Sequence, residues 1–331
     1  MTSSGPAFPV GGDIPVRRLG FGAMRITGPG TWGPPPDRAA ARALLRRAAG
    51  LGAELIDTAD AYGPGVSEEL IAEALFPYGG LLIATKGGYE RTGPSGRNAN
   101  GELIGWTPNG RPGHLRSACE ASLSRLRLDR IDLYQLHTPD PAVPYAESIG
   151  ALNELQREGK IRHIGISNVT LGQLAIARAV TAISTVQNHL DLTSHDWQDM
   201  LTECEPHKIG FIPYRPLRAW DDAKQRHALA RAASRHNASA SQIALAGCSR
   251  SRRSHCPSPG PQLKPPRSQR RSRRAPTRPR RDRCHQRGGF NTSRPIAGAE
   301  RECGVTETTV GRWRLLPQTT WLCVNQSSFE T

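Results

Sequence analysis

The chain has 331 residues, which is long enough for one α/β barrel or for two ordinary domains. Its net charge of +15 is a level typical of proteins that bind nucleic acids or membrane surfaces. Residues 247–294 contain 15 Lys+Arg and one acidic residue, Asp282, so this segment alone carries +14. The rest of the chain is nearly neutral, and its composition predicts neither of these partners.

Seven cysteines, an odd number without a C-x-x-C pair, argue against both a disulfide framework and a zinc ribbon. They predict reduced thiols, a cytoplasmic location and no metal site. Met1–Val10 lacks the basic and apolar parts of a signal peptide, and no apolar run approaches the roughly 18 residues that span a bilayer. We therefore expect no membrane partner.

Short β-branched or apolar runs alternate with amphipathic segments of about a dozen residues from Arg17 to Ala246, which is the pattern of repeated βα units. The segments have helical three-and-four spacing, so each helix can cover one face of a parallel sheet. The apolar runs predict strands at Leu19–Met24, Glu54–Asp57, Leu81–Thr85, Ile131–Leu136, Ile161–Ser167, Thr185–Asn188 and Gly210–Pro213.

An open doubly wound sheet and a closed (β/α)8 barrel both fit this pattern. The open sheet usually carries a G-x-G-x-x-G phosphate loop after its first strand. Gly20 and Gly22 lie on the first predicted strand, but no helix-opening glycine follows them. The pattern therefore favours an α/β barrel domain over residues 14–246, preceded by a flexible N-terminus at 1–13.

The regular pattern stops after Ala246. Between Gly247 and Gly289 the only large aliphatic or aromatic residue is Leu263, which is too little apolar surface to offset the entropy of ordering. We expect disorder over the Arg-, Pro- and Ser-rich segment 247–294 and assign no fold to the tail at 295–331. The eighth strand and last helix of the barrel are then missing or disrupted, which leaves two open sheet edges.

Polar side chains follow the predicted strands, at the end of a βα barrel where functional residues gather. Each of them alone has an ordinary structural explanation, such as a loop cap or a solvated side chain. Those separate explanations do not account for the shared position of these side chains at one mouth of the barrel. The residues are Asp57, Tyr62, Lys86, His137, Ser167, Asn168, Gln187, Asn188 and Tyr214.

Four of these side chains together would make a proton donor for a carbonyl oxygen. Tyr62 would be the general acid, with Lys86 lowering the pKa of its phenol from the usual value near 10. Asp57 would hold Lys86 charged and oriented, and His137 would position the substrate oxygen by a hydrogen bond. No side chain donates hydride, so a reduction implies a nicotinamide cofactor.

The sequence resembles the aldo-keto reductase family, whose members are NADP(H)-dependent oxidoreductases built on a TIM barrel. The likeness covers roughly residues 14 to 246, and the catalytic tetrad of the family is present in order as Asp57, Tyr62, Lys86 and His137. The matching motifs are Leu55–Gly63, Ala84–Lys86, Asp132–His137, Gly159–Asn168, Val186–Asn188 and Pro213–Leu217.

The resemblance also implies where NADP(H) and a small-molecule carbonyl substrate bind. Ser167, Asn168 and Gln187 would hold the nicotinamide carboxamide, and Tyr214 would stack on the ring. Trp32 and Trp106 would line the substrate pocket, or else each packs its own loop. Further cofactor contacts would come from Gly22, Ala23, Met24, Asp57, Pro216 and Leu217.

Two alternatives to a reductase remain open at this point. The barrel could bind a nicotinamide nucleotide as a sensor or partner subunit without turnover, although the complete tetrad argues against that. The Arg-rich segment could bind nucleic acid with a steep salt dependence. It contains no aromatic residue before Phe290 to stack on bases, so such binding would be nonspecific.

A shifted reading frame is the other interpretation of the Arg-rich segment. Codons that encode Cys256–Pro261 as TGC CCA TCC CCG GGA CCC read two bases later as Pro-Ile-Pro-Gly-Thr, which resembles the eighth strand and turn of the family. Codons for Pro265–Arg271 read one base later as His-Leu-Glu-Ala-Asn-Val, which resembles the start of its cofactor-binding helix.

We predict that the coding DNA yields both hidden segments in shifted frames, which requires two insertions or deletions because the two frames differ. Sequencing the gene tests this directly. Bases that cannot produce either segment in a shifted frame would show that the basic tail is the genuine product.

Overall fold

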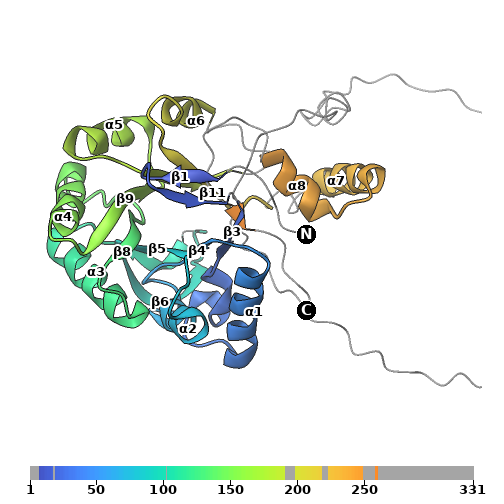
Figure 1. Cartoon of the computed structure of the whole chain (residues 1–331), viewed down its shortest axis with the longest axis horizontal. Coiled ribbons are helices and arrows are strands. Elements are labelled where there is room, and N and C mark those ends of the chain that lie inside the picture. The colour runs from blue at the N-terminus through green and yellow to red at the C-terminus, as the bar shows by residue number, and fades with distance from the viewer. Residues whose placement is uncertain are drawn as a thin grey trace, which may run out of the picture.

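The computed structural model describes residues 7–17, 19–101, 103–190, 198–217, 223–248 and 258–259. Seven parallel strands form a curved sheet in the order β11-β10-β9-β8-β5-β4-β3, with helices on its outer side (Figure 1). This arrangement confirms the predicted barrel-type α/β fold. The strands are β3 (Leu19–Gly22), β4 (Leu55–Asp57), β5 (Leu82–Gly87), β8 (Ile131–Leu136), β9 (Ile161–Ser167), β10 (Thr185–His189) and β11 (Gly210–Tyr214).

The helices follow from local sequence signals and an apolar face. The Asp37 side chain caps α1 by accepting from the Ala40 N–H at 2.8 Å, and Leu45 on that helix is fully buried. Thr170 and Gln173 form a capping box at the start of α5. The helices are α1 (Arg38–Gly50), α2 (Val66–Leu75), α3 (Pro112–Leu126), α4 (Tyr145–Arg157), α5 (Leu171–Val180), α6 (Gln198–Cys204), α7 (Ala223–His236) and α8 (Ala240–Cys248), with short 3-10 turns η1 (Met24–Ile26) and η2 (Pro29–Thr31).

The eighth position of the sheet is occupied by a strand of two residues, β12 (Ser258–Pro259). It pairs in parallel with β3 at Leu19 and Gly20, and no ladder joins it to β11 within the described residues. The helices α7 and α8 pack on each other in a small apolar cluster of their own, apart from the other helices (Figure 1). The barrel is therefore incomplete, as the sequence predicted.

The strand β12 lies within the segment 256–261 that the shifted-frame hypothesis assigns to the eighth strand. That hypothesis stays a prediction, because the fold does not report on the gene. The rest of the predicted disordered segment, apart from residues 247–248 and 258–259, and the whole tail at 295–331 lie outside the described residues.

The N-terminal residues differ from the flexible segment expected at 1–13. Residues Phe8–Val10 (β1) and Ile14–Val16 (β2) form an antiparallel hairpin. Phe8, Val10 and Val16 pack with side chains at the amino ends of the strands, including Leu55 and Leu82. Burial of these three apolar side chains offsets the entropy of ordering the segment. The apolar runs in this segment are too short for the sequence alone to predict the hairpin.

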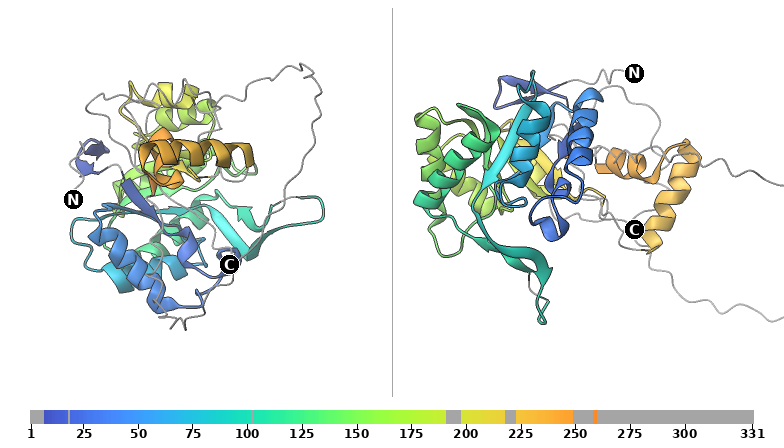
Figure 2. Two further views of the ribbon diagram at one scale, coloured as in Figure 1. Left: turned by 90° about the vertical axis from the view of Figure 1, so that its right-hand side faces the viewer. Right: turned by 90° about the horizontal axis from the view of Figure 1, so that it is seen from below.

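A second hairpin occupies the glycine-rich stretch between β5 and α3. It consists of β6 (Tyr89–Arg97) and β7 (Leu103–Pro108), with Arg91 opposite Trp106 and a register shift between Arg91 and Gly96. The hairpin follows β5 at the mouth of the barrel and stands out from the body of the molecule (Figure 2). Its glycines and proline interrupt the alternating pattern from which strands are predicted.

Three further expectations concern membranes, cysteines and metal ions. None of the helices in the described ranges is long and apolar enough to cross a membrane. Cys119 and Cys204 are buried free thiols. Among the described residues, no group of three or more His, Cys, Asp or Glu side chains is arranged to hold a metal ion.

Candidate active site

The predicted site residues come together at the carboxyl ends of the strands, as parallel barrel geometry requires. There eight of them line a cavity of about 220 Å³. The cavity brings together side chains from the ends of β8, β9, β10 and β11, from the β6–β7 hairpin and from the segments that follow β3, β4 and β11. Its lining residues are Met24, Tyr62, Tyr89, Ser95, Leu103, Trp106, His137, Ser167, Asn168, Gln187, Tyr214 and Arg215.

A buried ion pair lies beneath this cavity. The Lys86 ammonium donates to Asp57 Oδ2 at 2.7 Å, to the Thr58 carbonyl at 2.8 Å and to the Tyr62 hydroxyl at 3.4 Å. The side chains of Lys86 and Asp57 are 0% and 2% exposed. All three N–H donors of the ammonium are therefore used, so its orientation is fixed.

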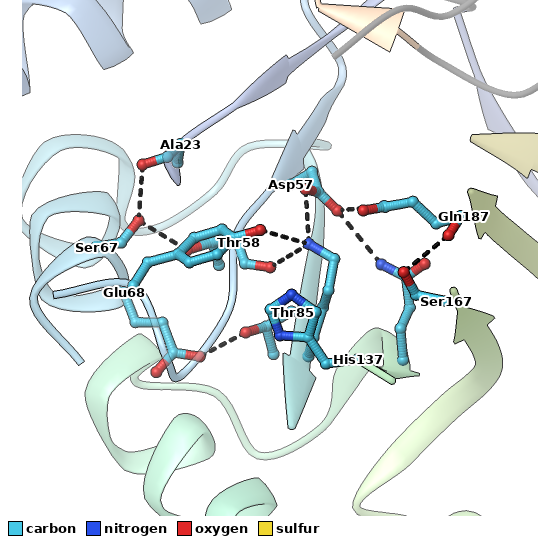
Figure 3. A network of polar contacts seen from close by, with 12 residues as sticks. Ala23, Asp57, Thr58, Ser67, Glu68, Thr85, His137, Ser167 and Gln187 are labelled. Carbon is cyan, nitrogen blue, oxygen red and sulfur yellow. Dashed lines mark hydrogen bonds and ion pairs between the residues drawn. The ribbon is translucent and has the colours of Figure 1, made fainter. Parts of the chain in front are cut away.

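The second carboxylate oxygen of Asp57 is held from the opposite side of the barrel. Gln187 Nε2 donates to Asp57 Oδ1 at 2.8 Å, and Gln135 Nε2 donates to the same atom at 3.3 Å. Figure 3 shows Asp57 and Gln187 in this network of polar contacts. The carboxylate thus connects strands β4, β5, β8 and β10 through direct hydrogen bonds.

Tyr62 is 3% exposed and lies between the ion pair and the cavity. Burial, and next the negative charge of Asp57, raise the pKa of its phenol well above the usual value. The sequence-based expectation of a lowered pKa for Tyr62 is wrong, because desolvation of the phenolate has the largest effect. Tyr62 therefore keeps its proton at neutral pH and has one to give.

His137 lies against Tyr62 with the ring centroids 5.7 Å apart. Burial, together with the positive charges of Lys86 and Arg91, lowers the pKa of the imidazole well below its usual value. The ring is therefore neutral at neutral pH and carries one N–H donor. Its Nδ1 atom is buried and makes no hydrogen bond within the described residues, so hydrogen-bonding capacity is left over beside the cavity.

The other side of the cavity is lined by amides, a hydroxyl and a phenol. Ser167 donates to the Gln187 carbonyl at 2.8 Å, Asn168 Nδ2 donates to the His137 carbonyl at 2.9 Å, and the Tyr214 hydroxyl donates to Asn168 Oδ1 at 2.7 Å. Asn168 has a φ of 58°, a left-handed conformation that asparagine tolerates better than most residues. These groups match the donors and acceptors of a carboxamide and offer an aromatic face, so the residues present fit a nicotinamide.

Some of the remaining predicted residues lie at or beside the cavity, and others do not line it. Met24 lines the cavity, and the Ala23 N–H donates to the Asp57 carbonyl at 2.8 Å, beside the pairing of Gly22 with Asp57. The cavity lining does not include Trp32, Pro216 or Leu217. It does include Tyr89, Ser95, Leu103 and Arg215, which sequence reasoning missed.

A second buried network supports the strand that carries Lys86. Glu68 is fully buried and accepts from Thr85 Oγ1 at 2.6 Å (Figure 3). It also accepts from Arg125 Nε at 2.6 Å. Burial, and next the charge of Glu68, raise the pKa of Asp60 to about 8, so Asp60 is mostly protonated at neutral pH. Asp60 therefore adds little negative charge beside the Lys86 ammonium.

The fold is of the α/β-barrel class, with polar side chains gathered around a cavity at the carboxyl ends of its strands. The sequence profile described as "Aldo/keto reductase family" matches residues 18–246. The chain therefore belongs to the aldo/keto reductase family, as the motifs predicted.

Known relatives support this assignment. An uncharacterized oxidoreductase of Schizosaccharomyces pombe (strain 972 / ATCC 24843) is 43% identical over 234 residues, which cover 71% of this chain and 74% of that protein. Pyridoxine 4-dehydrogenase of Escherichia coli (strain K12) is 38% identical over 239 residues, covering 70% of this chain and 80% of that protein.

Solved structures share the fold. The glycerol dehydrogenase from Gluconobacter oxydans matches with a TM-score of 0.62 and 29% identity, over 74% of this chain and 82% of that chain. An aldo-keto reductase from Klebsiella pneumoniae, solved in complex with NADPH, matches with a TM-score of 0.55 and 23% identity, over 74% and 81% of the two chains. At that identity the second match shows the fold alone.

We predict that Arg125→Ala destabilises the protein by about 3 kcal/mol, because it leaves the buried Glu68 carboxylate without its cation. The free energy of unfolding from urea denaturation measures this. Arg116→Ala is the matched control on the same helix, since its ion pairs with Glu154 and Glu158 lie on the surface and contribute little. Equal effects of the two substitutions would contradict a structural role for the Glu68 network.

Proposed function

We propose that this chain is an NADP(H)-dependent reductase of aldehydes or ketones in which Tyr62 is the general acid. The observation that supports this most directly is the contact of the Lys86 ammonium with both Asp57 and the Tyr62 hydroxyl, directly beneath a cavity that fits a nicotinamide. The cofactor, when bound, supplies the hydride. The protein supplies the proton and the polarisation of the carbonyl.

Tyr62 would give its proton to the substrate oxygen while the hydride reaches the carbonyl carbon. The phenolate left behind is stabilised by the charge and the hydrogen bond of Lys86, which Asp57 holds at 2.7 Å. The neutral imidazole of His137 would donate a hydrogen bond to the same oxygen and so favour the developing negative charge. Both roles use groups that are already in place in the protein.

Four residues would hold the cofactor at its nicotinamide end. Ser167, Asn168 and Gln187 would bind the carboxamide, and Tyr214 would lie against the ring. Met24 lines the same cavity beside them.

The relative named pyridoxine 4-dehydrogenase acts on a substituted pyridine. The aromatic residues Tyr89 and Trp106 in the cavity likewise favour a flat ring, so we propose an aromatic aldehyde as substrate, with benzaldehyde and pyridoxal as probes.

We predict that Tyr62→Phe lowers kcat for aldehyde reduction by about 10²- to 10⁴-fold, because the general acid is lost. The Kd of NADPH, measured by fluorescence titration, stays within about twofold because the cofactor contacts remain. The matched control is Tyr145→Phe, whose hydroxyl is buried without a hydrogen-bond partner within the described residues. Full activity of Tyr62→Phe would refute the mechanism, and NADPH binding by the wild type without any turnover would replace it with a cofactor-binding function.

We predict that Asp57→Asn moves the alkaline limb of the kcat profile to lower pH. Reduction needs Lys86 and Tyr62 protonated, so activity is lost as the pH rises through their pKa values. Burial lowers the pKa of Lys86 and the Asp57 carboxylate opposes that effect, while the same carboxylate raises the pKa of Tyr62. Its removal therefore lowers both pKa values.

The pH profile of Asp132→Asn provides the control, because Asp132 pairs with Arg162 on the surface, away from the cavity. An Asp57→Asn enzyme that loses activity equally at every pH, without a displaced limb, would show that Asp57 does not act through the pKa values of these two groups.

A further inference from the structure

Arg91 on β6 makes an unusually complete set of hydrogen bonds. A guanidinium has five N–H donors, and each of the five reaches a backbone carbonyl. Nε donates to Gly105 at 2.7 Å, Nη1 to Thr31 at 2.9 Å and to Ala61 at 2.6 Å, and Nη2 to Gly30 at 3.2 Å and to Gly93 at 3.0 Å. No carboxylate lies within ion-pair distance of Arg91 in the described part of the chain, so its hydrogen bonds all go to backbone carbonyl dipoles.

These five carbonyls belong to three different segments. Gly30 and Thr31 lie in η2 after β3, Ala61 directly precedes Tyr62, and Gly93 and Gly105 lie in the β6–β7 hairpin itself. Arg91 therefore ties the hairpin to the loop that carries Tyr62 and to the loop that follows the first barrel strand.

The same guanidinium covers an aromatic side chain of the cavity. Its carbon lies 3.7 Å from the centroid of the Trp106 ring and 5.6 Å from the centroid of the Trp32 ring. Trp106 makes edge contacts with Tyr62, Tyr89 and His137, at centroid distances of 6.3, 5.3 and 6.0 Å. Because Arg91 covers one face of Trp106, it sets the position of the ring that borders Tyr62 and His137.

We propose that Arg91 is a positioning residue that selects substrates by holding Trp106 and the β6–β7 hairpin against the loop of Tyr62. This inference rests on the proposed reductase function for its kinetic part. Arg91 does not line the cavity, so it acts on the substrate through Trp106. Carbonyl compounds with a flat ring depend on that wall, whereas small aliphatic aldehydes do not reach it.

Lysine cannot replace this arginine. An ammonium keeps the charge but has three donors and no flat surface, so at least two carbonyls and the stacking on Trp106 are lost. Arg91→Lys therefore separates the geometry of the side chain from its charge.

The test uses the full chain and measures kcat and KM for benzaldehyde and propanal, with the Kd of NADPH. In Arg91→Lys we expect the KM of benzaldehyde to rise about tenfold, with the KM of propanal and the Kd of NADPH within about twofold. Arg97→Lys is the matched control in the same hairpin, because among the described residues Arg97 donates to the Gly101 carbonyl within its own hairpin. Equal changes for both aldehydes, or no change for either, would overturn the proposal.

Two further measurements test whether Arg91 acts through Trp106 and whether its positioning role can be detected independently of the proposed reductase activity. A double variant with Trp106→Leu should have the same KM for benzaldehyde as Trp106→Leu alone, and additive effects would contradict the proposal. Hydrogen exchange over residues 89–108 should be faster in Arg91→Lys than in Arg97→Lys. If the wild type reduces neither aldehyde, the reductase proposal fails, and unchanged exchange would then overturn the positioning role as well.

Discussion

The buried ion pair between Asp57 and Lys86 is the interaction on which the site depends. Two charges without solvent exposure are costly unless every hydrogen-bonding group on both is satisfied. Here the ammonium uses its three donors, and the carboxylate accepts from Lys86, Gln187 and Gln135. Meeting that requirement draws side chains from four strands to one point, and Tyr62 receives its hydrogen bond as part of the same arrangement.

Two further charged side chains extend this centre outward, and each uses a different kind of partner. Arg125 neutralises the buried Glu68, which in turn holds Thr85 next to Lys86 and so links the helix layer to β5. Arg91 has no carboxylate partner in the described ranges and is satisfied by carbonyl groups of three loops. The first stabilises the barrel behind the site, and the second fixes the wall in front of it.

The incomplete barrel leaves this centre intact, because its residues come from strands β4, β5, β8, β9, β10 and β11 and from the loop after β4. The eighth position holds only two residues, which pair with β3 and not with β11 in the described part of the chain. The residues proposed for proton donation and for nicotinamide binding at the cavity therefore lie within the family match at 18–246. No described side chain beyond Leu217 lines the cavity.

The sequence by itself determined the strand positions and the residues of the tetrad. Strands such as Ile131–Leu136 are apolar runs bounded by turns, and the carboxyl ends of parallel strands must meet at one face. Only the tertiary structure decided the rest. Gly93, Pro94 and Gly96 interrupt the alternating pattern by which the β6–β7 hairpin could have been predicted. The partners of Arg91 are backbone carbonyls, which every residue has, so the sequence does not single them out. The pKa of Tyr62 depends on burial, which exists only once the chain has folded around it.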